Sequence, residues 1–418
     1  MAKTKKIALA AAAALLCIAG VGAPAFAQET QTVQEPPRPR PVSTVFGRGS
    51  DVGRGDWVFL PPMATVFDRS RPDYGAPGII TPGWRIYPEM GIEATYDDNI
   101  FATETNEEED FVFTWTPAVR IASDWSQHMV GIEGNLRVEE FASESSEGST
   151  QGGASAFGRY DLGEDGAIFG NASYRRTVAD RIDPEDITAE RTEYDRYEGR
   201  AGYVRDFSTI NLRVFGGLRR FDFFNATDQD RDRNEVYVNA RASFGWSARI
   251  TPFLDASYTT QDFDDAVDDS GVNRDADRYG IGAGARFDIT DLIQAELSAG
   301  VERSEFDDPT LAAFTSVSAN GSLIWNPTEV TSVIAGLSRR ADTTTQAGAS
   351  GRVDSDISVR VEQEIRRDIL GYAEVRASRR EFEGGLREDD ILFLTAGGEY
   401  LLNQYVSLYA RYEFADRD

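Results

Sequence analysis

The amino-acid sequence predicts an all-β protein, a transmembrane antiparallel up-and-down β-barrel of about 16–18 strands. Apolar and polar residues alternate over segments of about 9–13 residues, which is the length that a tilted strand needs to cross a bilayer. Short and long connections follow one another in turn between these segments, as in outer-membrane barrels. Beyond the N-terminal segment, no stretch approaches the roughly 18 consecutive apolar residues of a membrane-spanning helix.

The composition of the 418-residue chain fits this class. Hydrophobic residues make up 41% of the chain, below the usual share for a globular domain. A transmembrane barrel tolerates this composition because only one face of each strand has to be apolar. The net charge of −27 repels nucleic acid and disfavours that class of partner. The expected partners are outer-membrane lipid, lipopolysaccharide and the barrel-assembly machinery of a Gram-negative bacterium.

Residues 1–27 read as a signal peptide. A basic stretch at 1–6 precedes an apolar run at 7–22, and Ala25-Phe26-Ala27 fits the small-x-small cleavage rule. The rival interpretation is a lipoprotein signal that uses Cys17, but Leu16 stands where that signal needs a small residue. Cys17 is the only cysteine, so the sequence excludes an intrachain disulfide and a cysteine-based zinc site.

Residues 28–82 are rich in Pro, Gly and Arg and have no sustained period. We interpret them as a periplasmic or irregular N-terminal segment. The outer-membrane barrel is expected to occupy residues 83–418.

The first strand follows Gly83, with Ile86 and Ile92 on one face and Glu89 and Glu93 on the other. The same alternation recurs at 111–121, 130–139, 236–246, 278–287, 293–302, 392–402 and 406–414. Short turns are expected at 123–125, 162–166, 205–207, 288–291, 326–328, 366–368 and 402–404. Long polar loops are expected at 97–110, 141–151, 177–191, 222–233, 261–275, 303–310, 341–351 and 379–389.

The pattern gives about 17 strands, whereas single-chain bacterial barrels have an even number and both termini in the periplasm. A seventeenth strand would run outward, and Phe414 is followed by four polar residues instead of closing the chain. Either the count is wrong by one, or the last strand is missing. We favour a truncated sequence whose intact form has about 18 strands.

Three short motifs carry a family resemblance. Residues 71–74 read Arg-Pro-Asp-Tyr and residues 96–100 read Tyr-Asp-Asp-Asn-Ile, while Pro117 precedes Ser-Asp-Trp at 123–125 and His128. The chain thereby resembles the "putative β-barrel porin 2" family of outer-membrane proteins, found mostly in α-proteobacteria, over about residues 75–414. The resemblance implies an outer-membrane barrel and no catalytic residues. Because some members are encoded beside exopolysaccharide synthesis and export genes, it also implies a role in glycan export.

No motif indicates catalysis, a cofactor or a metal. His128 is the only histidine and lies beside a short turn with no Ser-centred motif, so we expect it to have a structural or turn role. Gly280, Gly282 and Gly284 lie inside a strand and not in a dinucleotide-binding loop. We expect these small inward residues to make room for large neighbours or for a loop folded into the lumen. The acidic run at 264–271 lacks the EF-hand spacing. It reads as a solvated outer loop, with calcium binding as the alternative.

The inward-facing residues carry both signs of charge. They form either a network of Arg–carboxylate pairs that braces the wall, or a transverse field that filters solutes; the two readings are compatible. The predicted pore-lining residues are Arg85, Glu89, Glu93, Arg120, Glu133, Arg137, Arg213, Arg241, Arg278, Arg286, Glu296, Arg360, Glu362, Glu374, Arg376 and Glu399.

The sequence therefore favours a porin-like channel or conduit in the outer membrane, with exopolysaccharide and its export machinery as partners implied by the resemblance. The alternative is a structural or surface-interaction barrel with a plugged lumen and acidic external loops. An outer-membrane enzyme is disfavoured, since the lone histidine has no accompanying nucleophile motif.

Overall fold

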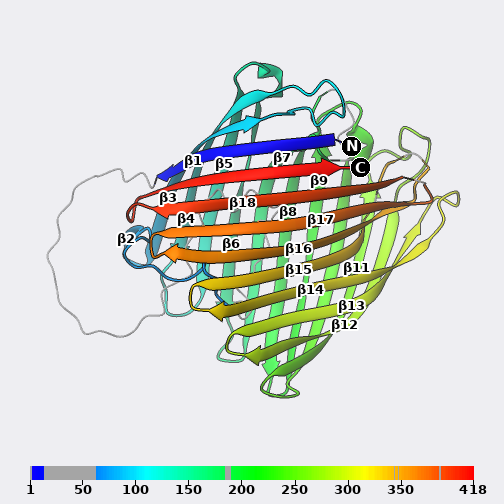
Figure 1. The fold of residues 1–418 in the computed structure, drawn as a ribbon. Coiled ribbons are helices and arrows are strands. Elements are labelled where there is room, and N and C mark those ends of the chain that lie inside the picture. The colour runs from blue at the N-terminus through cyan, green and yellow to red at the C-terminus, as the bar shows by residue number, and fades with distance from the viewer. Residues whose placement is uncertain (1, 14–62, 184–189, 343, 347, 386) are drawn as a thin grey trace.

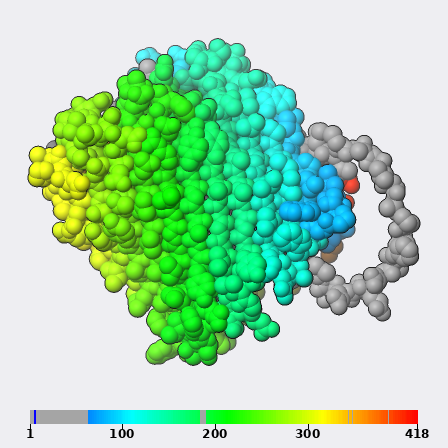
Figure 2. All heavy atoms as spheres, turned by 180° about the vertical axis from the view of Figure 1, so that it is seen from behind, coloured from blue at the N-terminus to red at the C-terminus, as the bar shows by residue number. Residues whose placement is uncertain are grey.

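The computed structural model describes residues 2–13, 63–183, 190–342, 344–346, 348–385 and 387–418. These residues form one antiparallel sheet that closes on itself, with consecutive strands as neighbours (Figure 1). The described sheet contains 19 strands, and all but the three-residue β2 are long, which gives a closed barrel of 18 strands. From behind, the strands form a continuous wall in chain order (Figure 2).

The strands are β1 Ala2–Ala13, β2 Ile79–Thr81, β3 Trp84–Asp97, β4 Asp110–Ser123, β5 Met129–Phe141, β6 Ser149–Asp161, β7 Gly166–Val178, β8 Glu193–Phe207, β9 Ile210–Phe223, β10 Arg233–Phe244, β11 Ile250–Phe263, β12 Ala276–Thr290, β13 Ile293–Phe306, β14 Phe314–Thr328, β15 Thr331–Asp342, β16 Gly351–Arg366, β17 Ile369–Glu383, β18 Glu388–Leu401 and β19 Val406–Arg417. Two one-turn 3₁₀ helices, Ser145–Glu147 and Gln229–Arg231, lie in long loops. No helix in the described ranges is long and apolar enough to cross a membrane.

The predicted fold class is confirmed, and the predicted strands from residue 83 onward correspond to β3–β19. The eighteenth position is filled from an unexpected part of the chain. β1 pairs antiparallel with both β19 and β3, so it lies in the seam where the barrel closes. Because β3 and β19 run in the same direction, a strand between them is needed for the barrel to close with antiparallel pairs throughout.

β1 belongs to the segment predicted to be a signal peptide. That segment and its cleavage remain a prediction, and residues 14–27 lie outside the described ranges. The N-terminal segment predicted at 28–82 is described from residue 63. It is irregular up to Gly78 and then forms β2, which pairs with the start of β3.

The connections alternate as predicted, except that the long loop expected at 379–389 is absent, because β17 extends to Glu383 and β18 begins at Glu388. At one end of the barrel, short turns such as 208–209, 291–292 and 329–330 join the strands, and at the other end the strands are joined by long loops such as 98–109 and 264–275. We call these the short-turn end and the long-loop end.

At the long-loop end, residues 179–183 at the start of the loop after β7 extend over the mouth of the barrel. Ile182 packs into a small apolar cluster with Ala102, Ile391 and Ala415. The Arg417 guanidinium donates to the Ile182 carbonyl over 3.0 Å. Because β1 and β3–β6 separate β7 from β19 in the sheet order, this loop must pass over the lumen to make these contacts.

Of the three β12 glycines singled out in the sequence, Gly284 makes room for a large neighbour, as predicted, whereas a Cβ on Gly280 would first meet Ser257 and one on Gly282 only backbone atoms. Gly284 faces inward beneath the ring of Phe253, which is only 3% exposed. A Cβ on Gly284 would lie 2.5 Å from that ring and 2.4 Å from the carbonyl oxygen of Leu297. Both contacts are too short for real atoms, so the strand needs glycine here.

Replacing Gly284 with Ala is expected to lower the free energy of unfolding by about 1–3 kcal/mol, because the ring and the neighbouring strand have to shift. Urea unfolding of the protein in lipid vesicles measures the change. Gly199→Ala is the matched control, since a Cβ on that β8 glycine meets nothing within 4 Å. Equal losses in the two variants would contradict the steric explanation.

Candidate functional site in the lumen

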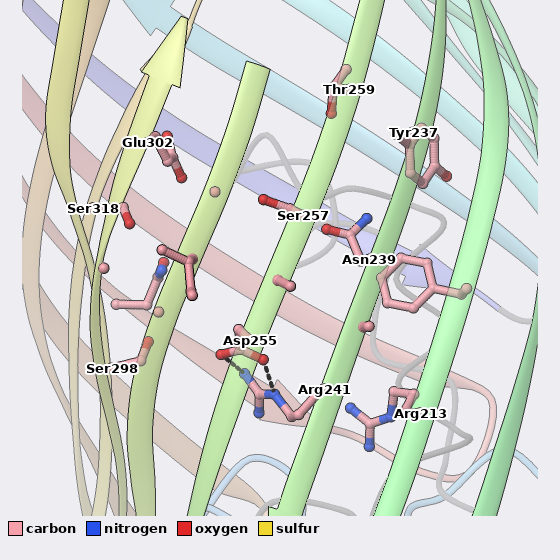
Figure 3. Close-up of a pocket in the computed structure, with 18 of the residues that line it drawn as sticks. Arg213, Tyr237, Asn239, Arg241, Asp255, Ser257, Thr259, Ser298, Glu302 and Ser318 are labelled. Carbon is pink, nitrogen blue, oxygen red and sulfur yellow. Dashed lines mark hydrogen bonds and ion pairs between the residues drawn. The ribbon is translucent and has the colours of Figure 1, made fainter. Parts of the chain in front are cut away.

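The candidate site is a cavity of about 760 Å³ on the inner face of the wall from β7 to β15. Arginines on β8, β9 and β10 form one side of the cavity, and small polar residues on β11–β15 form the other (Figure 3). The arginines are Arg196, Arg200, Arg213, Arg219 and Arg241. The polar residues include Ser257, Thr259, Ser298, Ser318, Asn320, Ser322 and Ser338.

The contacts of Arg241 show that this face is concave. Its guanidinium binds Asp255 on the adjacent strand, with Nε 2.7 Å from Oδ1, and Glu296 on β13, with Nη1 2.7 Å from Oε1. β11 and β12 separate β10 from β13, and neighbouring strands lie about 4.8 Å apart. Side chains this far apart along the sheet meet only where the wall curves toward them, so Arg241 and Glu296 point into the barrel. Figure 3 shows Arg241 beside Asp255 on this face.

A second charged cluster lies farther along the same face. Arg219 donates to Glu235 over 2.9 Å and also pairs with Glu198 at 3.4 Å. Glu198 accepts hydrogen bonds from Arg196 and from the hydroxyl of Tyr237. These ion pairs cross strands, so they connect β8, β9 and β10 side by side.

Aromatic rings hold several of the inward arginines flat against the wall. The guanidinium carbon lies 3.8 Å from the ring centroid in Arg241–Phe253 and Arg360–Tyr372, and 4.1 Å in Arg376–Phe393. A planar guanidinium binds a carboxylate at its edge and a ring at its face. Both kinds of contact therefore fix the side chain without filling the lumen.

The predicted pore-lining residues lie on this inner face around the whole wall, and the structure brings only Arg213, Arg241 and Glu296 into the cavity. Elsewhere the ion pairs are Arg85–Asp124, Arg137–Glu139, Arg278–Asp342, Arg286–Asp288, Arg360–Glu362, Arg360–Glu374 and Arg411–Glu93. The other contacts are Glu133 accepting from Ser155, Arg120 over Phe157 and Arg376 over Phe393. Glu399 is 9% exposed on β18, and Glu89 lies four residues before Glu93 on β3, on the same face.

The sequence analysis missed Arg196, Glu198, Arg219, Glu235 and Asp255 as cavity or cluster residues. The period-two alternation of the strands could have identified part of this set. Arg196 and Glu198 alternate with outward residues on β8, and Glu235 shares the parity of Arg241 on β10. No sequence signal indicates that Arg241 reaches β13, because that contact depends on the curvature of the closed sheet.

A comparison with models of protein families matches residues 71–418 to the family described as "Putative beta-barrel porin 2". The chain belongs to this family. Family and fold together point to an outer-membrane location. A search of curated proteins found no match.

Solved barrels of outer-membrane transporters are similar to this porin-family barrel. The FrpB iron transporter from Neisseria meningitidis is 10% identical with a TM-score of 0.46, and the alignment covers 77% of this chain and 61% of that one. The copper transporter OprC is 10% identical with a TM-score of 0.43, and the alignment covers 76% of this chain and 65% of that one. The ferric-catecholate import receptor Fiu from E. coli K12 is 8% identical with a TM-score of 0.42, and the alignment covers 81% of this chain and 78% of that one. The chain thus spans less than two thirds of the length of the first two.

His128 has the turn role that the sequence predicted. It adopts a positive φ of 64° in the turn between β4 and β5, and its amide donates to Asp161 over 2.8 Å. Its Nδ1 accepts the Asp161 amide over 3.0 Å, and its ring stacks on Tyr160. These contacts fix the turn to the end of β6.

The acidic run at 264–271 is exposed, as predicted for a solvated loop, except at Asp268. Asp268 is 7% exposed and Arg274 is 3% exposed, and Nε of Arg274 lies 2.7 Å from Oδ2 of Asp268. Arg274 also donates to the carbonyls of Thr344 and Ala349, which ties this loop to the loop after β15. Within the described ranges, no three His, Cys, Asp or Glu side chains are grouped as metal ligands.

Asp268 is an ionised anchor for this loop. Burial opposes its ionisation, but hydrogen bonds from Ser270, from the Val272 amide and from Arg274 outweigh that cost and hold the pKa of the Asp268 carboxyl below its usual range. A lowered pKa means that the carboxylate stabilises the loop fully above its unfolded-state pKa of about 3.9. This stabilisation is lost as the pH falls through the lower pKa of the folded state.

The two ion pairs of Arg241 can be tested by removing its charge. Arg241→Met is expected to lower the free energy of unfolding by about 1–2 kcal/mol, because two half-buried carboxylates lose a shared partner. Arg303→Met is the control, since Arg303 and Glu305 form an ion pair of the same kind with side chains 54% and 49% exposed. Its expected loss is under about 0.5 kcal/mol. Denaturant titration in vesicles measures both, and a loss at Arg303 as large as that at Arg241 would contradict the bridging role.

The buried pair of Asp268 and Arg274 in the outer loop can be tested by its pH dependence. Hydrogen exchange of the Val272 amide, corrected for its intrinsic rate, is expected to lose protection as the pH falls below about 4. Arg274→Ala is expected to reduce the protection at least about tenfold at neutral pH, because it removes the charge-assisted hydrogen bond to Asp268 together with those to the carbonyls of Thr344 and Ala349. In Asp268→Asn the protection should be low at every pH. Protection that stays constant into strong acid in the unmodified protein would count against an ionised anchor.

Proposed function

We propose that this protein is a porin-like channel or conduit of the outer membrane that passes polysaccharide, and that it is not an enzyme. The observation that carries the proposal is the polar cavity of about 760 Å³ inside a closed barrel of 18 strands. A barrel of this size encloses an aqueous lumen unless another part of the chain fills it. Membership of the porin family supports the same role.

The chemistry of the cavity favours a sugar chain over a small ion as its occupant. The polar residues on β11–β15 are mostly hydroxyls, with glycines between them (Figure 3). Hydroxyl and amide groups exchange hydrogen bonds with sugar hydroxyls, and each single bond is weak. Conduction needs contacts of this kind, favourable enough for entry and weak enough for release.

The arginine side of the cavity favours a sugar chain that carries carboxylates. Five arginines and four acidic residues line the cavity, in a chain whose net charge is −27. The cavity wall is therefore much less repulsive to an anion than the protein as a whole. Exopolysaccharides that contain uronic acids fit this description, and the export machinery that delivers such a polymer would be the partner at the short-turn end.

The second candidate function is a structural or surface-interaction barrel with a blocked lumen. It is favoured by the loop after β7, which crosses the long-loop end through Ile182 and its contact with Arg417. In this case the acidic outer loops would carry the function.

Single-channel recording of the refolded protein in a planar bilayer separates the two candidates. We expect stable open steps, and we expect fragments of a uronic-acid polysaccharide to interrupt the current at lower concentration than neutral maltodextrins of the same length. Heat-modifiable migration on gels is the control for folding. A folded barrel that passes no current would overturn the conduit and leave the surface-interaction barrel, and equal block by both glycans would overturn the preference for anionic chains.

A further inference from the structure

Residues 63–72 lie inside the barrel at the short-turn end. Val66 is fully buried, and its amide donates over 2.8 Å to the hydroxyl of Ser332, which is also fully buried. The Phe67 amide donates to Glu362 over 3.1 Å. Ser332 and Glu362 belong to the inward-facing sets of β15 and β16, because Val359 and Val361 beside Glu362 are exposed on the outer face. The segment therefore covers the inner wall.

Further contacts spread the segment along the wall. Gln294 on β13 accepts the Met63 amide over 3.1 Å, and Asn326 on β14 donates to the Ala64 carbonyl over 3.2 Å. At the other end, Gln404 in the turn before β19 donates to the Pro72 carbonyl over 3.0 Å. The segment is thus held by side chains of the wall from β13 to β19, and its backbone joins no ladder of the sheet.

Arg71 is the central anchor. Its Nη2 lies 2.8 Å from Oε2 of Glu364 on β16 and donates over 2.9 Å to the carbonyl of Val66. The contact with the Val66 carbonyl folds the segment back on itself, and the contact with Glu364 attaches the folded segment to the wall. Phe67 adds an edge-to-face contact with Tyr372, at 5.9 Å between ring centroids, and lies under the guanidinium of Arg360.

We propose that residues 63–72 are the constriction that sets the largest polymer the conduit admits at its short-turn end; this inference rests on the proposed function. The segment occupies one side of the lumen, over β13–β19. The lining of the polar cavity on β7–β15 includes no residue of 63–72. A transported chain would pass between the segment and the arginine side of the wall, so displacing the segment enlarges the passage.

The test reverses the charge of the anchor. Arg71→Glu places two carboxylates together and is expected to release the segment, to raise the single-channel conductance about twofold, and to raise the size of the largest polyethylene glycol that enters the pore. The double variant Arg71→Glu with Glu364→Arg restores the pair with its charges exchanged, and both values should return toward those of the unmodified protein. Arg303→Glu, a reversal in the exposed pair with Glu305, should leave both unchanged.

A second readout follows the segment itself. Ser332→Cys, alone and combined with Arg71→Glu, reports whether the segment has left the wall, because Val66 covers this position. A water-soluble maleimide should label the new cysteine slowly in the single variant and rapidly in the double variant with Arg71→Glu. Val66→Asp, which forces a charge into a fully buried position, is an independent way to release the segment.

The outcomes separate the inference from the function on which it rests. If Ser332→Cys becomes reactive while conductance and polymer size stay the same, the segment does not set the passage, and the conduit stands without it. If neither Arg71→Glu nor Val66→Asp makes Ser332→Cys reactive, these contacts do not hold the segment, and the proposal is overturned. If the released variants and the unmodified protein all pass no current, the conduit itself fails.

Discussion

The structure depends on one constraint, that every backbone N–H and C=O of a membrane-spanning wall has to find its partner within the wall. Lipid offers no hydrogen bonds, so a sheet in a membrane has to close. Closure of an antiparallel sheet requires an even number of strands, which is why β3 and β19, running in the same direction, need a strand between them. β1 meets this need by pairing along both edges.

Closure also decides where the charge lies. Midway along the strands the outer face exposes apolar residues such as Val359, Val361 and Val375, so the charged residues there collect on the inside, where many meet an opposite charge. Outward ion pairs such as Arg303–Glu305 lie near the strand ends. Apart from three lysines within residues 1–6, all the cations are arginines. A guanidinium binds two carboxylates at its edge and an aromatic ring at its face, as Arg241 does with Asp255, Glu296 and Phe253. A lysine ammonium could not make this set of contacts at once.

Period-two alternation was sufficient to predict β3–β19, the sorting of short and long connections, and the inward side of residues such as Glu93, Arg241 and Glu296. It could not predict contacts that depend on curvature or on neighbouring loops. Arg241 meets Glu296 only because the sheet closes, and Asp268 is buried only because Arg274 bridges to the loop after β15. Residues 63–72 have no period at all, so nothing in the sequence indicated that they lie inside the barrel.

The wall of the barrel and the segments that narrow its lumen therefore differ in stability. The wall is held by continuous ladders of backbone hydrogen bonds, and opening it requires breaking many of them together. Residues 63–72 at one end and the start of the loop after β7 at the other are held by side-chain contacts, such as Arg71–Glu364 and Arg417–Ile182. Segments held in this way open with less free energy than the core sheet. The diameter of the wall fixes the upper limit of what passes, but the weakly held segments fix the actual width, so the selectivity of such a barrel can change without any change in its strands.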